Sequence, residues 1–342
     1  MGLYRAGPTD GVAWITGASS GIGRALAVDL ARRGYTVAVT SRDKERLDEL
    51  VEESAGYAGG ILSYPADVSD EDAMADMVEA IEREAGPLTL VVLNAGNYYP
   101  TRGERLQTSN FVRTYDVNVL GVVYCLVPAV DCMRARGFGH VAIIGSASAN
   151  FAWPSAAAYG SSKAALNYLA ESLKFDFDKF NIRIQVINPG FIDTPLTDKS
   201  PFRMPFLMTV DQAVARLSRA ILHGGFSTTF PLRLKLVLQA LALLPQPWRF
   251  ALINRLTGWD RRRAGNGKAN PNTKQTSAPR PPTSSTSTWP SSTPESSSMP
   301  ALSMAWTGLS VSICPACCPS GRSGSATGRR QHRRTTSRLR FR

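Results

Sequence analysis

The sequence predicts an α/β fold, in which a doubly wound parallel sheet of about seven strands carries helices on both faces. Short β-rich stretches alternate with helical ones from Val12 to Phe230, which is the pattern of consecutive βα units. The stretches LTLVVL and VAIIG are apolar at successive positions, as expected of strands covered by helices on both sides. A glycine-rich turn joins the first strand to the first helix, which is typical of a Rossmann-type sheet.

The elements follow one another in a single βα series, which favours one domain over residues 1–258. The expected strands cover residues 12–16, 35–40, 61–64, 88–93, 140–148, 182–190 and 226–230. The expected helices cover residues 22–33, 43–53, 70–84, 111–136, 156–180 and 210–222. Residues 231–258 then form an amphipathic C-terminal extension.

Residues 259–342 form a basic, low-complexity tail that is expected to be disordered. The tail is rich in Ser, Thr, Pro, Gly and Arg, a composition that cannot assemble a packed core and that also fits translation past a frameshift. Residues 261–342 hold 14 Lys and Arg against one acid, whereas residues 1–260 hold 25 basic and 26 acidic side chains. The net charge of +12 therefore belongs to the tail. Without an organised basic face, the tail predicts no specific nucleic-acid partner.

The cysteines and the N-terminus suggest a reducing, cytoplasmic setting. Cys125 and Cys132 lie in one helical stretch with no nearby His or third Cys, so we interpret them as small hydrophobic residues rather than metal ligands. The tail's Cys314, Cys317 and Cys318 resemble only half a zinc site. The N-terminal residues lack a charged flank followed by an apolar run, so no signal peptide is expected.

The first βα turn has the residue pattern of a dinucleotide site. The run TGASSGIG follows a predicted strand and opens a predicted helix, the context that such a site requires. Gly17 permits the tight turn, Gly21 lets the backbone approach a pyrophosphate, and Gly23 lets the helix pack against the strand. A purely structural glycine turn is the alternative. The expected phosphate-binding residues are Gly17, Ser19, Ser20, Gly21, Ile22 and Gly23.

The end of the second strand indicates which cofactor binds. An NAD site usually has Asp or Glu there to bind the ribose 2′-hydroxyl, but this sequence has Ser41 and Arg42. The forked guanidinium of Arg42 can hold a 2′-phosphate, and no carboxylate at position 41 repels it. Asp43 is expected to cap the following helix. The sequence therefore predicts NADP(H) rather than NAD.

A tyrosine and a lysine four residues apart carry the predicted chemistry. Tyr159 and Lys163 project from the same face of the helix expected over residues 156–180. Because a free phenol has a pKa of about 10, it is a poor base at neutral pH, and a nearby ammonium favours the phenolate. We expect a desolvated Lys163 beside a cationic nicotinamide to lower the pKa of Tyr159 by about three pH units. Ser146 ends a buried strand, where the edge of the sheet faces the cofactor crevice.

With these motifs in order, the chain resembles the short-chain dehydrogenase/reductase family over roughly residues 11–230. The matching motifs are TGASSGIG, Asp67-Val68, Asn94-Ala95-Gly96, Asn118, Ser146, Tyr159 with Lys163, and Pro189-Gly190 followed by Thr194. One departure is Leu93, where the family commonly has Asn.

The resemblance implies a role for each catalytic candidate. Tyr159 would be the general acid in reduction, and Ser146 would polarise the carbonyl. Lys163 would bind the nicotinamide ribose and lower the tyrosine pKa, and Asn118 would order a proton-relay water. An Asn satisfied inside a helix remains the alternative for Asn118. Asp67 would contact the adenine, and the implied cofactor contacts are Asp67, Val68, Asn94, Ala95, Gly96, Pro189, Gly190, Ile192 and Thr194.

The stretch over residues 191–208 contains three prolines and lies where a lid would close over substrate. Two interpretations remain for its apolar side chains. They either line a substrate pocket for a lipophilic carbonyl or alcohol, or they pack in the core. These side chains are Phe202, Met204, Phe206, Leu207 and Met208. Further candidate wall residues are Asn97, Tyr98, Tyr99 and Trp153.

The extension over residues 231–258 is too short and too charged for a transmembrane span. We expect it to pack on the domain or on a second subunit of a homodimer or homotetramer, with peripheral membrane contact as the alternative. The sequence thus predicts an NADP-dependent oxidoreductase of small carbonyl or alcohol substrates. A catalytically silent dinucleotide-binding regulator is the other hypothesis, against which the intact Ser146, Tyr159 and Lys163 argue.

Overall fold

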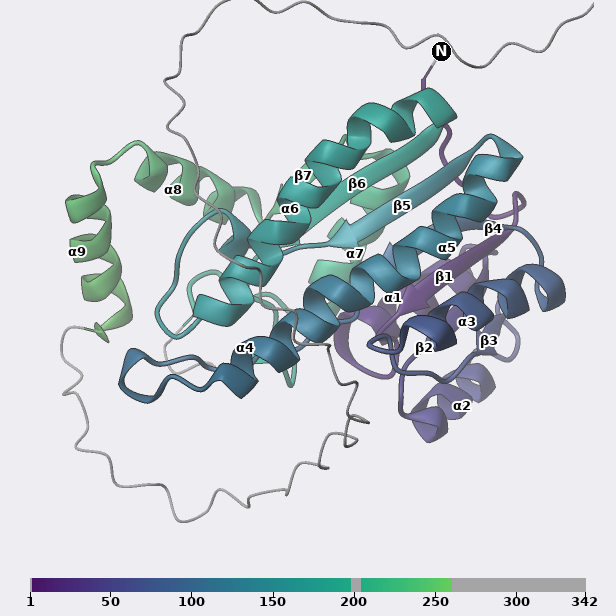
Figure 1. The fold of residues 1–342 in the computed structure, drawn as a ribbon, viewed down its shortest axis with the longest axis horizontal. Coiled ribbons are helices and arrows are strands. Elements are labelled where there is room, and N and C mark those ends of the chain that lie inside the picture. The colour runs from purple at the N-terminus through teal and green to yellow at the C-terminus, as the bar shows by residue number, and fades with distance from the viewer. Residues whose placement is uncertain (1, 198–203, 260–342) are drawn as a thin grey trace, which may run out of the picture. The chain divides into compact units, whose positions relative to one another are not determined.

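Figure 1 shows the fold of the computed structural model, which describes residues 2–197 and 204–259. All of these residues belong to one compact unit. Apart from Trp259, the predicted tail with its three cysteines lies outside the described residues, as does Phe202 of the predicted pocket.

The described residues form a seven-stranded sheet in which every neighbouring pair is parallel. The strands are β1 (Val12–Thr16), β2 (Thr36–Thr40), β3 (Ile61–Ser63), β4 (Leu88–Leu93), β5 (Gly139–Ile144), β6 (Ile182–Pro189) and β7 (Ser227–Phe230). Their order is β3-β2-β1-β4-β5-β6-β7, so the winding direction reverses between β1 and β4. Ligands of such sheets bind at this switch point, outside the carboxyl ends of the strands. The predicted fold class is confirmed.

Helices cover both faces of the sheet (Figure 1). The α-helices are α1 (Gly21–Arg32), α2 (Lys44–Glu53), α3 (Glu71–Glu84), α4 (Thr108–Tyr115), α5 (Gly121–Arg136), α6 (Ala157–Phe177), α7 (Val210–His223), α8 (Leu232–Ala242) and α9 (Gln246–Thr257). Apolar side chains of α1, α2 and α7 pack in one core cluster, and those of α3, α5 and α6 pack in the cluster on the other face. Cys125 is buried in the second cluster, as predicted, and Cys132 is half-buried beside it.

The long helix predicted over residues 111–136 is present as one continuous helical stretch, Thr108–Arg136, which contains a π-helical segment that the sequence did not predict. Helix α4 begins at Thr108, and the π-helical segment η2 (Asp116–Leu120) separates it from α5. At Gly121 an added Cβ would lie 2.9 Å from the carbonyl oxygen of Val68, so the chain passes very close to the loop after β3. The wider π turn places Asn118 at a fully buried position.

Within the part of the chain that the structure describes, one helical stretch, Thr108–Arg136, is long and apolar enough to cross a bilayer by length and composition. Val122, Leu126 and Met133 of this stretch pack in the core cluster that faces the sheet. Part of its apolar surface therefore belongs to the core, whereas Val112, Leu120 and Val127 of the same stretch are exposed.

The C-terminal extension folds as the helical pair α8–α9, which Figure 1 shows beyond the end of the sheet where β6 and α6 lie. Leu234, Leu238 and Leu241 of α8 and Ile253 of α9 form a third apolar cluster with Phe151 and other side chains. One face of the extension therefore packs on the domain.

Candidate functional site

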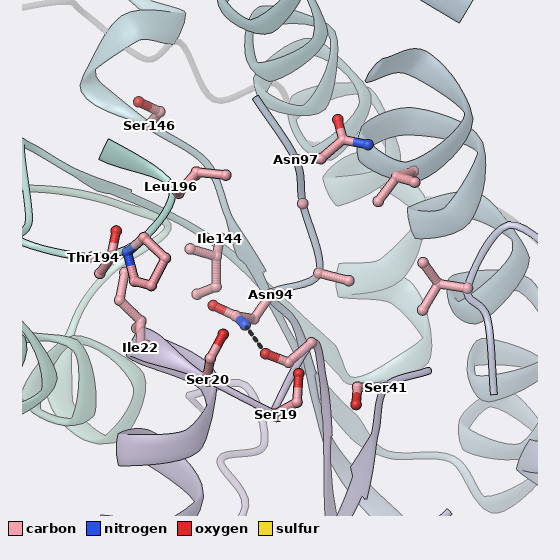
Figure 2. A pocket seen from close by; sticks show the side chains of 18 of the residues that line it. Ser19, Ser20, Ile22, Ser41, Asn94, Asn97, Ile144, Ser146, Thr194 and Leu196 are labelled. Carbon is pink, nitrogen blue, oxygen red and sulfur yellow. Dashed lines mark hydrogen bonds between the residues drawn. The ribbon is translucent and has the colours of Figure 1, made fainter. Parts of the chain in front are cut away.

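A cavity of about 680 Å³ opens at the carboxyl edge of the sheet, at the switch point between β1 and β4. Nearly all of the predicted site residues line it: Gly17, Ser19, Ser20, Gly21, Ile22, Gly23, Ser41, Arg42, Asp67, Val68, Asn94, Ala95, Gly96, Ser146, Tyr159, Lys163, Pro189, Gly190, Ile192 and Thr194. Figure 2 shows Ser19 and Ser20 on one side of it, with Thr194 and Leu196 between them and Ser146. Segments that are distant in sequence thus meet at one site.

The glycine turn between β1 and α1 has the conformation that its residues predict. Gly17 and Gly21 both have left-handed backbones, with φ of +69° and +56°. A Cβ at Gly23 would lie 2.3 Å from the carbonyl oxygen of Gly17, so only glycine lets α1 start this close to the strand. Ser20 is the N-cap residue of α1, but its side chain makes no capping hydrogen bond with any residue that the structure describes. The helix N-terminus therefore leaves backbone donors available for an anion.

Asn94 holds the turn against the end of β4. Its Nδ2 donates to the carbonyl oxygens of Thr16 and Gly17 at 3.0 and 3.1 Å. In return, the backbone N–H groups of Asn94 and Ala95 donate to the Thr16 hydroxyl, each at 3.1 Å. Asn94 therefore borders the cavity mainly as a brace between two strand ends.

Arg42 lies in the loop after β2 and lines the cavity, at the position where the sequence predicts a contact with a 2′-phosphate. Its side chain is 75% exposed and its Nη1 lies 3.6 Å from Oδ2 of Asp67, a weak surface ion pair that leaves the guanidinium free to move to a stronger anion. The carboxylate of Asp43 accepts from the backbone N–H of Arg46 at 3.2 Å and caps α2, as predicted.

Ser146 follows β5 and is positioned by a neighbour that the sequence did not single out. The backbone N–H of Ser146 donates to Oδ1 of Asn188 at 2.9 Å. A Cβ at Gly145 would lie 2.0 Å from the same oxygen, so the Asn188 side chain requires glycine there. Asn188 precedes the Pro189-Gly190 pair, which was the available signal.

Tyr159 and Lys163 both project from α6 into the site. Nζ of Lys163 donates to the carbonyl oxygen of Ile144 at 2.8 Å, and burial lowers the pKa of this lysine to about 8. Burial raises the pKa of Tyr159, while its hydrogen bond with Ser146 acts in the opposite direction. In this structure Nζ lies 6.0 Å from the ring centroid, and desolvation outweighs the other effects on the pKa of Tyr159. That Lys163 lowers this pKa when it lies beside a cationic nicotinamide stays a prediction.

Asn118 is fully buried behind the cavity wall rather than in it. Its Nδ2 donates to the carbonyl oxygen of Asn97 and to the Ser162 hydroxyl, both at 3.1 Å, and its Oδ1 accepts from the backbone N–H of Asn97 at 2.8 Å. The side chain thus anchors the loop after β4. A Cβ at Gly96 would lie 3.4 Å from Oδ1 and 3.6 Å from Nζ of Lys163, so both groups border one small space. The proton-relay role stays a prediction.

The substrate side differs from the predicted wall. Met208 is buried in the core, where it pairs with Ile192, while Phe206 and Leu207 are exposed. None of these three wall candidates lines the cavity, among the residues that the structure describes. Tyr98 packs edge-on against the Tyr159 ring at 5.4 Å between centroids. Asn97 and Tyr99, two of the further candidate wall residues, do line the cavity. The structure adds these cavity residues: Asp43, Ala66, Val117, Ile144, Gly145, Pro195, Leu196 and Thr197.

The residues present fit a dinucleotide. The left-handed Gly17 and Gly21 and the uncapped start of α1 suit a pyrophosphate, and the exposed Arg42 suits a phosphate on the ribose. The cavity volume lies within the range of small-molecule and cofactor sites. A doubly wound sheet with this site at its switch point defines a dinucleotide-binding oxidoreductase of the Rossmann type.

Comparison with known proteins shows which family of oxidoreductases the chain belongs to. The sequence matches the family described as short chain dehydrogenase over residues 11–203. An uncharacterized oxidoreductase of Myxococcus xanthus is 36% identical over 246 residues, which are 71% of this chain and 96% of the relative. This chain belongs to the short-chain dehydrogenase/reductase family, whose members are oxidoreductases of alcohol and carbonyl groups.

Two solved structures share the fold. An alcohol dehydrogenase from the archaeon Thermococcus sibiricus, complexed with 5-hydroxy-NADP, is 28% identical with a TM-score of 0.58, covering 64% of this chain and 95% of that one. A short-chain dehydrogenase from Sphingobium yanoikuyae, in complex with NADPH, has a TM-score of 0.61 at 24% identity and covers 71% of this chain and 95% of that one.

Proposed function

We propose that the protein is an NADP(H)-dependent carbonyl reductase or secondary-alcohol dehydrogenase in which Tyr159 is the general acid and base. The observation that carries the proposal is the convergence of Ser146, Tyr159 and Lys163 on the cavity that the glycine turn also lines. A catalytically silent nucleotide-binding regulator would need no phenol, hydroxyl and buried ammonium at the same cavity.

The three side chains have complementary tasks. A bound reduced nicotinamide supplies a hydride to the carbonyl carbon. The carbonyl oxygen then needs a proton, which the Tyr159 hydroxyl donates, and the Ser146 hydroxyl, already hydrogen-bonded to Tyr159, donates to the same oxygen and orients it. Lys163 is held by the Ile144 carbonyl and keeps its other donors for the ribose hydroxyls.

The state of Tyr159 supports reduction as the favoured direction. Because burial raises its pKa above the usual value, the phenol is protonated at neutral pH and ready to act as an acid. Oxidation needs the phenolate, which a cationic charge near the hydroxyl would have to stabilise. Reduction is therefore expected to hold its rate across neutral pH, while oxidation rises with pH.

A substrate panel tests the activity. Ketones and 3-oxoacyl compounds are offered with NADPH, and hydroxysteroids with NADP⁺, and the absorbance of NADPH reports turnover. Tyr159→Phe keeps the ring that packs against Tyr98 and removes only the proton donor, so kcat is expected to fall by about 10²- to 10⁴-fold. A turnover that Tyr159→Phe leaves intact would exclude the proposed role.

The preference for NADP(H) rests on Arg42 and on the absence of an acid at position 41. The complex of the Thermococcus sibiricus enzyme with an NADP derivative supports this choice. Arg42→Ala is expected to raise the KM for NADPH by roughly tenfold or more, since one charge-assisted phosphate contact is lost, and to leave the KM for NADH unchanged. Arg46→Ala, on the neighbouring turn of α2, is the matched control. Equal changes in both KM values would contradict the preference.

A lipophilic substrate is favoured by the aromatic side chains next to the cavity. Trp153 packs against Phe151 at 5.8 Å and Phe191 at 5.4 Å between ring centroids. Ala147, which follows Ser146, belongs to the same apolar cluster. Phe191 of the cluster follows Gly190, which lines the cavity. The expected outcome of the panel is lower KM values for bulky apolar ketones than for short ones.

We propose that the protein forms a homodimer or homotetramer through the exposed sides of helices α4 to α6. Helices α4 to α6 leave large apolar side chains exposed, which monomers rarely gather in number. These side chains are Val112, Leu120, Val127, Tyr168 and Phe175. Analytical ultracentrifugation of the wild type and of Phe175→Glu tests this, with a smaller species expected for the variant.

A further inference from the structure

We propose that the exposed face of the helical pair α8–α9 docks on an anionic membrane surface. The face is defined by Leu232, Leu236 and Leu243 of α8, and α9 adds exposed apolar side chains on several of its sides: Trp248, Phe250 and Leu256. Leu243 is 87% exposed, Trp248 68% and Leu232 65%. Side chains of this size are seldom left in water together without a partner.

Helix α8 is apolar on two opposite sides. At 3.6 residues per turn, Leu234, Leu238 and Leu241 share the side that packs on the domain. Leu232, Leu236 and Leu243 fall within about 40° of one another on the opposite side. The domain therefore uses only half of the apolar surface, and the other half points away from it.

The charge of the helical pair selects the partner. Residues 231–259 contain four basic side chains and no acid, whereas residues 1–230 contain 21 Lys and Arg against 25 Asp and Glu. Arg233 and Lys235 flank the outer leucines of α8, and Arg249 and Arg255 lie on α9. Basic side chains beside leucine and tryptophan fit the headgroup region of an anionic bilayer. The basic tail is not complementary to this face, because both are positive.

The helix that carries the docking face packs against the site through its opposite side. A Cβ at Gly190 would lie 2.5 Å from Cδ2 of Leu234, so α8 packs directly on a residue that lines the cavity. Ala147, next to Ser146, belongs to the same apolar cluster as Leu234 and Leu238. If the proposed reductase activity is correct, docking would bring the cavity to the surface where lipophilic substrates partition. The docking itself does not depend on that activity.

Vesicle sedimentation of the full chain at physiological salt tests the proposal. Phosphatidylcholine vesicles with and without phosphatidylserine are compared, and the tail is present in every variant, so its contribution cancels. Leu236→Ser with Leu243→Ser is expected to weaken binding at least about tenfold, because both leucines lose burial in lipid. Arg233→Gln with Lys235→Gln is expected to weaken binding to the anionic vesicles by about 30-fold.

The control places the same change at an exposed apolar side chain elsewhere. Leu106→Ser removes an apolar side chain that is 64% exposed and lies outside the surface proposed for self-association, and vesicle binding should be unchanged. Trp248→Phe should reduce the tryptophan quenching caused by lipids with brominated acyl chains. Binding that the Leu236 and Leu243 variant leaves intact would overturn the proposal, since the tail then accounts for it. An oligomer that dissociates in this variant would overturn it in favour of a second copy.

Discussion

The two edges of the parallel sheet treat buried polar side chains differently. Toward the amino edge, Nε2 of His140 on β5 donates to Oε1 of Gln185 on β6 at 2.8 Å, and Nε2 of Gln185 donates to the carbonyl oxygens of Ala220, Gly224 and Gly225. At the carboxyl edge, Ser146 and the Lys163 ammonium face a cavity. At both edges the polar side chains lie next to the two apolar clusters that cover the sheet. A buried polar side chain therefore does not by itself mark a functional site.

The difference lies in what the polar groups face. At the amino edge, hydrogen bonds within the protein occupy Gln185, which fixes the orientation of its amide and stabilises the packing of α7 on β6. At the carboxyl edge, Lys163 has three donors, and one of them is used by the Ile144 carbonyl. A substitution at the carboxyl edge should therefore change turnover, and one at the amino edge should change stability.

Lys163→Met, at the carboxyl edge, is expected to have the largest effect, which is a loss of kcat/KM. It removes a buried ammonium and keeps the length of the side chain, so kcat/KM should fall at least about 100-fold while the thermal midpoint stays level or rises. Lys174→Met, on the same helix and paired with Asp178 in a surface ion pair, is the control. A large loss of stability in Lys163→Met would contradict the functional assignment.

Gln185→Leu breaks the amino edge. The change removes the acceptor of His140 Nε2 and the donor to three carbonyl oxygens. The loss of these bonds should lower the free energy of unfolding by about 3 kcal/mol. Chemical denaturation measures this loss. The KM for NADPH should be unchanged, and a raised KM with intact stability would show that the two edges are not separate.

Gly23→Ala tests the cofactor side of the carboxyl edge. The new Cβ would lie 2.3 Å from the carbonyl oxygen of Gly17, so the turn must shift at a cost of roughly 1–3 kcal/mol. NADPH binding, measured by fluorescence titration, should weaken by about tenfold, which corresponds to about 1.4 kcal/mol. Gly60→Ala, where an added Cβ meets no described atom within 4 Å, should change neither quantity.

The pH dependence of stability tests the amino edge without a change at Gln185. Burial lowers the pKa of His140 to about 4 from an ordinary value of 6.5, so the unfolded chain binds a proton in this window and the folded one does not. Stability should therefore fall as the pH drops from about 6.5 toward 4, by on the order of 2 kcal/mol at pH 5. His140→Phe should flatten this part of the profile. An unchanged slope would mean that His140 is not its source.

Much of the fold could be predicted because each βα unit has its own local pattern. Strand ends were predicted within a few residues, and the glycine turn and the Tyr159 and Lys163 pair followed from spacing that a helix or turn enforces. The cavity then collected these residues because all parallel strands end at one edge.

The remainder depends on contacts between distant segments. The bond from Asn188 to Ser146, the burial of Asn118 by a π turn, and the balance that raises the Tyr159 pKa have no counterpart in a single local pattern. For the apolar side chains of the 191–208 loop the sequence left a pocket and core packing both open. The bridge between Ile192 and Met208 decides this for Met208, which packs in the core.

The bond between Lys163 and the Ile144 carbonyl has an evolutionary consequence. It ties α6 to the strand that leads into Ser146, so the groups proposed to transfer the proton, Ser146, Tyr159 and Lys163, are held by one strand and one helix. The loop after β6 and the helices α8 and α9 carry none of these groups. Mutations can therefore accumulate in these C-terminal parts and alter which molecules enter, while the reaction geometry is inherited intact.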